Sequence, residues 1–120
     1  MAKILLAEDD QSMLGFIKLA LEKAGHDVTA EGNGADALQH IEGGEDFDLL
    51  LSDIVMPGID GIELSQKASA LKPDLKVMFI TGFSAVAVGH DDFDESQAKI
   101  LAKPFHLNDL VEQVETLLAA

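Results

Sequence analysis

Charged side chains stand directly after short apolar runs at several separate places in this sequence. Glu8 and Asp9 follow the first run, and Asp53 follows the second. Lys103 follows a third run, and a fourth run closes on the hydroxyl-bearing Thr81. Three carboxylates, one ammonium and one hydroxyl can together bind a divalent cation and a phosphoryl group. The chemistry that these residues indicate is phosphoryl transfer.

Short apolar runs that alternate with helical patterns are typical of parallel strands buried on both faces of a sheet. Parallel strands point the same way, so their carboxyl ends meet at one edge, which is where open α/β sheets bind ligands. We therefore expect the side chains of Glu8, Asp9, Asp53, Thr81 and Lys103 to converge at that edge.

Five apolar segments have the length and composition of buried strands. They span residues 4–7, 27–31, 48–53, 77–81 and 99–102. Between them, apolar residues at helical spacing predict helices. These helices are expected to begin after a cap at Asp10 or Ser12, near Ala35, after Gly61, and at Asn108 or Asp109.

The segment 82–97 is the least regular part of the sequence. A short helix at 84–88 is one interpretation, but Gly89 and the four acids in 91–95 weaken it, and we expect a mobile segment there. With that helix the alternation is (βα)₅, which predicts an α/β fold with a doubly wound parallel sheet. We expect residues 1–120 to form a single domain.

Composition and charge exclude several classes of protein. The net charge of −14, with eight lysines and no arginine, argues against nucleic-acid binding and favours cations and basic partners. No apolar run approaches the ~20 residues that span a membrane. The first apolar stretch breaks at Glu8, too early for a secretory signal, so a cytoplasmic location is expected. The absence of cysteine excludes disulfides and thiol catalysis.

Three carboxylates at one sheet edge would repel one another. Two such charges ~4 Å apart interact by about 4 kcal/mol at an effective dielectric constant of 20, so the site must bind a proton or a cation. Oxygen ligands with room for water favour Mg²⁺. There are plainer alternatives: Asp10 as a helix cap, Thr81 as an ordinary strand residue, and Lys103 as a surface lysine. Pro104 argues for a fixed direction of the Lys103 side chain.

An ionised Asp53 is a nucleophile and could form an aspartyl phosphate without a general base. Lys103 and Mg²⁺ would offset charge on the transferring group, and the Thr81 hydroxyl would donate to it. A magnesium-dependent phosphohydrolase acting on small phosphoesters is an alternative. It would need a second acid where Val55 stands. An interaction module with an inactive site is a third interpretation. The four histidines have no metal-ligand spacing and are interpreted as surface residues: His26, His40, His90 and His106.

The spaced motifs resemble those of response-regulator receiver domains along the whole chain. They are Glu8-Asp9, Asp53 with Met56-Pro57-Gly58, Thr81-Gly82 and Lys103-Pro104-Phe105. The resemblance implies a flavodoxin-like fold with strand order 2-1-3-4-5. It implies that Asp53 accepts a phosphoryl group from phosphohistidine on a histidine kinase or a histidine phosphotransferase. It also implies Mg²⁺ held by Asp9, Asp53 and the Val55 carbonyl, with Glu8 acting through water, and a cis bond before Pro104.

The segments 79–83 and 101–107 are also similar to the CpdR subgroup of alphaproteobacterial receivers. This resemblance implies an adaptor of the ClpXP protease, whose partners are ClpX and protease substrates. The chain itself is expected to be a monomeric receiver without an output domain. Ile100 departs from the family, which often has an aromatic residue there, so the signal is expected to leave through 82–95 and Phe83. Leu14 and Ile17 are candidate contacts for the phosphotransferase.

Overall fold

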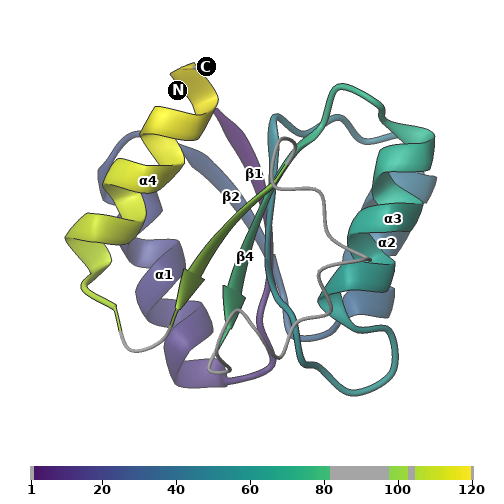
Figure 1. Ribbon diagram of the computed structural model, residues 1–120, viewed down its shortest axis with the longest axis horizontal. Helices are drawn as coiled ribbons and strands as arrows, with labels where there is room; N and C mark the ends of the chain where they lie inside the picture. The colour runs from purple at the N-terminus through teal and green to yellow at the C-terminus, as the bar shows by residue number, and fades with distance from the viewer. Residues whose placement is uncertain (1, 82–97, 103–104, 120) are drawn as a thin grey trace.

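Figure 1 shows the computed structural model, which describes residues 2–81, 98–102 and 105–119. Its five strands are β1 (Lys3–Ala7), β2 (Asp27–Glu31), β3 (Leu49–Asp53), β4 (Lys76–Thr81) and β5 (Ala98–Ala102). All neighbouring pairs are parallel, and the order across the sheet is β2-β1-β3-β4-β5. The doubly wound, flavodoxin-like prediction is confirmed, and each strand begins and ends within one residue of the predicted position.

Four helices cover the sheet in the described part of the chain. They are α1 (Gln11–Lys23), α2 (Gly34–Glu42), α3 (Gly61–Leu71) and α4 (Leu107–Ala119). Figure 1 shows α1 and α4 on one face of the sheet and α2 and α3 on the other. The start predicted for α4 was one or two residues late, since the Leu110 N–H already donates to the His106 carbonyl. The predicted helix at 84–88 lies outside the described residues.

The ends of the helices follow from local side-chain chemistry. Asp10 caps α1, and its carboxylate accepts the backbone N–H groups of Ser12 and Met13 at 3.0 and 3.2 Å. Gly25 follows α1 with a φ of 97°, a left-handed conformation that favours glycine. Asp60 caps α3 through the Glu63 N–H at 2.8 Å. The caps place the start of each helix next to the end of the preceding strand, where the candidate site residues stand.

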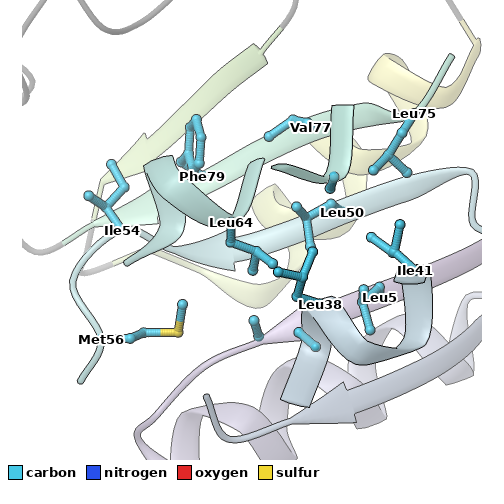
Figure 2. Close-up of a cluster of buried hydrophobic side chains, with 13 residues drawn as sticks. Leu5, Leu38, Ile41, Leu50, Ile54, Met56, Leu64, Leu75, Val77 and Phe79 are labelled. Carbon is cyan, nitrogen blue, oxygen red and sulfur yellow. The ribbon is translucent and has the colours of Figure 1, made fainter. Parts of the chain in front are cut away.

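Both faces of the central strands are buried, which explains their continuous apolar sequence. The cluster in Figure 2 packs Leu5, Leu50 and Phe79 of the sheet against Leu38 of α2 and Leu64 of α3. A second cluster lies between the opposite face and α1 with α4. Because both faces are packed, the strands are fixed in place and so are the residues at their tips.

The interpretation of His26 as a surface residue was wrong. Its side chain is only 7% exposed, and its Nδ1 accepts the Ala2 N–H at 3.2 Å. Its Nε2 lies 3.6 Å from a carboxylate oxygen of Glu115 on α4. His106 is exposed as predicted, and His90 lies outside the described residues.

His40 is also not a free surface residue, because both of its ring nitrogens face carboxylates. Nε2 lies 2.6 Å from a Glu31 oxygen, and Nδ1 lies 3.2 Å from a Glu45 oxygen. Glu45 is also held by the Lys3 ammonium at 3.4 Å. The hydrogen bond to Glu31 and then the one to Glu45 raise the pKa of His40 above 6.5. The hydrogen bond to His40 in turn lowers the pKa of Glu45.

This arrangement predicts that stability depends on pH near neutrality. Because the folded state has the higher His40 pKa, the protonated histidine contributes its full stabilisation below about pH 6.5. That contribution is lost as the pH rises through the raised pKa of the folded state. Urea unfolding at a series of pH values should therefore show a fall in the free energy of unfolding over this range. His40→Gln should flatten the fall, and an equally steep fall in that variant would contradict the assignment.

Candidate divalent-cation and phosphoryl site

The carboxyl ends of β1 and β3 bring three acids together. One carboxylate oxygen each from Glu8, Asp9 and Asp53 lies within 4.8 Å of the others. Thr81 ends β4, the next strand along, where Ile80 pairs in register with Asp53. Lys103 lies outside the described residues. Four of the five side chains expected at this edge therefore stand at the tips of three adjacent strands.

Burial differs among the three acids. Glu8 is fully buried, Asp53 is 6% exposed, and Asp9 lies on the surface. The Glu8 carboxylate accepts the Asp10 N–H at 3.1 Å, which fixes its direction. Buried carboxylates this close together favour a cation between them, because removal from water strengthens their repulsion. An oxygen-only set with an exposed member, which leaves room for water, fits Mg²⁺.

The backbone around Asp53 is held on two sides. The Ile54 N–H donates to the Ile80 carbonyl of β4 at 3.0 Å, and the Gly61 N–H donates to the Ile54 carbonyl at 2.7 Å. Ser52 is buried, and its hydroxyl donates to the Asp53 carbonyl at 2.8 Å. These bonds fix the point at which β3 ends, so the direction of the Asp53 side chain is set by the sheet.

Gly61 is a positional requirement that the sequence interpretation missed. A Cβ at this position would overlap the Asp53 carbonyl oxygen and come within 2.9 Å of the Ile54 Cα. The first residue of α3 must therefore lack a side chain if the helix is to begin against the end of β3. In the sequence, Gly61 directly follows the helix-capping Asp60, a pattern that indicates the start of a helix but not the close approach to β3.

Val55 stands two residues after Asp53, and 53% of its surface is exposed. Its apolar side chain offers no acid to protonate a leaving group, which a phosphohydrolase of small esters would need. A carboxylate nucleophile without a neighbouring general acid suits transfer from a good leaving group such as phosphohistidine.

The prediction that Ile17 is a contact for a phosphotransferase was wrong, because Ile17 is fully buried. Two other apolar residues of α1 are on the surface: Phe16 is 59% exposed and Leu19 is 52% exposed. They line a groove with Leu107 and Val111 of α4. The sequence alone does not distinguish Phe16 and Leu19 from Ile17, because all three residues are apolar.

No helix in the described part of the chain is long and apolar enough to cross a membrane.

The amino-acid sequence is similar to those of known proteins from one family. A family model described as the response regulator receiver domain matches residues 4–115. The chain is 55% identical to the response regulator receiver protein CpdR of Brucella abortus, over 100% of this chain and 99% of the relative. It is 33% identical to the sensor kinase CckA of the same organism, covering 98% of this chain and 12% of the kinase.

Solved structures agree with the family match. A CheY-like receiver domain protein from Methanospirillum hungatei superposes with a TM-score of 0.90 at 31% identity, covering 99% of this chain and 94% of that one. A receiver protein from Sinorhizobium medicae gives 0.89 at 30% identity, covering 98% and 94%.

Proposed function

Because this chain belongs to the response regulator receiver domain family, we propose that it is a phosphorylation-controlled switch of a two-component phosphorelay, with Asp53 as phosphoacceptor. The observation that supports this most directly is the cluster of Glu8, Asp9 and Asp53 oxygens within 4.8 Å at the carboxyl ends of β1 and β3. The donor would be phosphohistidine on a histidine kinase or a histidine phosphotransferase.

In the proposed reaction an Asp53 carboxylate oxygen attacks phosphorus, the phosphorus–nitrogen bond breaks, and the imidazole leaves and takes up a proton from water. Asp9, Asp53 and the Val55 carbonyl would hold Mg²⁺ directly and Glu8 would act through a water. The cation would offset the charge on the phosphoryl oxygens. The Thr81 hydroxyl and the Lys103 ammonium would contact the remaining oxygens of the aspartyl phosphate.

Incubation with acetyl phosphate and Mg²⁺ tests this function without a partner. One phosphoryl group should be taken up per chain, in a metal-dependent manner, and mass spectrometry should place it on Asp53. A second assay, release of phosphate from p-nitrophenyl phosphate, distinguishes the switch from a phosphohydrolase of small phosphoesters. Sustained turnover of that ester would favour a phosphohydrolase, whereas its absence together with stoichiometric labelling favours the switch.

The groove between α1 and α4 is the proposed docking surface for the phosphohistidine donor. Helix α1 begins two residues after Asp9, and its exposed Phe16 and Leu19, which line the groove, suit an apolar helix face. The double variant Phe16→Ala, Leu19→Ala should slow transfer from the donor about tenfold, which corresponds to about 1.4 kcal/mol.

The same double variant should accept phosphate from acetyl phosphate at the wild-type rate. Leu71→Ala is a matched control, because Leu71 is 52% exposed but lies at the end of α3 on the other face of the sheet. Equal slowing in the control variant, or equal slowing with both phosphate donors, would show that the groove is not the docking surface.

For the output we propose a CpdR-like adaptor, supported by the 55% identity over the full chain. The chain would act as a monomeric receiver in the cytoplasm, and phosphorylation would change its affinity for ClpX or for protease substrates. Immobilised wild-type and Asp53→Ala proteins, compared for retention of purified ClpX with and without acetyl phosphate, test this proposal. Equal retention under all conditions would contradict it.

A further inference from the structure

Strand β2 is the edge strand nearer to the acid cluster. It pairs only with β1, and Val28 is the one buried residue of its five. Its last residue, Glu31, accepts the Glu8 N–H through its backbone carbonyl at 3.1 Å. The position of the Glu31 backbone therefore bears directly on one member of the acid cluster.

The side chain of the same Glu31 is bound by His40 of α2, nine residues later, at 2.6 Å. This contact closes residues 31–40 into a loop, which we call the 31–40 strap. The strap contains the turn between β2 and α2 and the first two turns of α2. Asn33 caps α2 within it, accepting the Asp36 N–H at 2.8 Å.

The middle of the strap lies against the chain that follows β1 and against the chain that follows β3, and these two segments adjoin the acids. A Cβ on Gly32 would come within 3.1 Å of the Gln11 side-chain nitrogen, two residues after Asp9. A Cβ on Gly34 would come within 2.6 Å of the Ile59 carbonyl oxygen, in the loop that follows β3. Movement of the strap would therefore be transmitted to the chain on both sides of the acid cluster.

His40 makes both of its hydrogen bonds to carboxylates in only one protonation state. Two carboxylates face its two nitrogens, at 2.6 and 3.2 Å, so both contacts are hydrogen bonds only when both nitrogens carry protons. The neutral ring would place a lone pair against one carboxylate. The other groups around the ring are Lys3, which holds Glu45, the edge-on ring of Phe47, and two residues of α2, Asp36 and Gln39.

We propose that doubly protonated His40 is a positioning residue for the acid cluster: it closes the 31–40 strap and so holds Glu8, Asp9 and Asp53 in the arrangement that binds a divalent cation. The hydrogen bonds to Glu31 and Glu45 raise the pKa of His40 and so extend the pH range over which the ring stays doubly protonated. Deprotonation at higher pH weakens the closure, because one of the two hydrogen bonds is lost and a lone pair faces a carboxylate. This inference rests on the proposed function only for its relevance to phosphorylation, because cation binding can be measured by itself.

Electrostatics alone predicts the opposite result, which makes the test decisive. Neutralising His40, by mutation or by raising the pH, removes a positive charge from an already acidic molecule and would strengthen cation binding through Coulomb attraction. Release of the strap would weaken cation binding, because the acids lose their fixed arrangement. A fall in Mg²⁺ affinity when His40 is neutralised therefore indicates a positioning role, whereas a rise indicates a purely electrostatic effect.

The experiment is calorimetric titration with Mg²⁺ at about pH 6 and about pH 8, on either side of the ordinary pKa of histidine. Wild-type affinity should fall about fivefold at the higher pH, a change of about 1 kcal/mol. His40→Gln should have the weaker affinity at both pH values, and His40→Lys, which keeps a charge for Glu31, should recover part of it without the pH dependence. Glu42→Gln, an exposed charge change on the same helix, should resemble wild type.

Tighter Mg²⁺ binding in His40→Gln, or an affinity equal to wild type at both pH values, would overturn the proposal. Circular dichroism of each variant separates loss of the strap from loss of the fold. Phosphoryl uptake is measured in parallel. If the wild type binds Mg²⁺ as described but takes up no phosphoryl group, the proposed function fails and the positioning role stands; labelling of Asp53 with a pH-independent Mg²⁺ affinity gives the reverse result.

Discussion

Replacing Asp53 by asparagine should abolish uptake of a phosphoryl group from acetyl phosphate and leave the fold intact. The amide keeps the size of the side chain, so packing at the end of β3 is preserved, but it is no longer an anionic nucleophile. Without metal, the same change should raise the free energy of unfolding by about 1 kcal/mol. The reason is that it removes one of three neighbouring negative charges, Glu8 and Asp53 being buried.

The control is Asp27→Asn, which removes the same charge from an exposed position at the opposite end of the sheet. It should label like the wild type and change stability little. Labelling is measured by mass spectrometry, and stability by urea unfolding in the presence of a chelator. Undiminished labelling of Asp53→Asn, or a marked loss of its stability without metal, would contradict the assignment of the site.

Substituting alanine for Gly61 should give the largest structural effect of any single methyl addition at this site. The added Cβ would overlap the Asp53 carbonyl oxygen, so either α3 or the end of β3 must move. We expect a loss of about 3 kcal/mol in the free energy of unfolding, at the upper end of the usual cost of overpacking. Mg²⁺ affinity should fall with it, because the displaced backbone carries Asp53.

Gly15 provides a matched control for this substitution. It lies within α1 on the surface, and a Cβ there would meet nothing within 4 Å. Gly15→Ala should therefore stabilise the protein by about 0.5–1 kcal/mol through helix propensity alone. Urea unfolding of both variants gives the comparison, and a destabilisation of similar size in each would show that the close approach at Gly61 is not the cause.

The architecture was predictable because its signals are local. Continuous apolar runs mark strands buried on both faces, and the polar residue that follows each run marks the sheet edge. These two signals are enough to predict that Glu8, Asp9 and Asp53 lie close together, which the structure confirms. The strand order could not be predicted from such local signals. Its prediction, which the structure confirms, came from the resemblance to a family and not from any spacing in the sequence.

What the sequence did not reveal depends on contacts between distant segments. His40 was interpreted as a surface residue because its partners Glu31 and Glu45 cannot be identified until β2 and α2 pack. Ile17 and Phe16 are adjacent and both apolar, and only the rotation of α1 on the sheet shows that Ile17 is buried and Phe16 exposed. The roles expected of Lys103 and of residues 82–97 lie outside the described residues and stay predictions.

The most direct test of the central claim is a Mg²⁺ titration of the ¹⁵N-labelled protein followed by amide chemical shifts. A single saturable site at the carboxyl ends of β1 and β3 should shift the amides of residues 8–10 and 53–55 together, with one dissociation constant, and Asp53→Asn should weaken that response. Small, non-saturating shifts spread over the acidic surface, with no preference for those residues, would contradict the account.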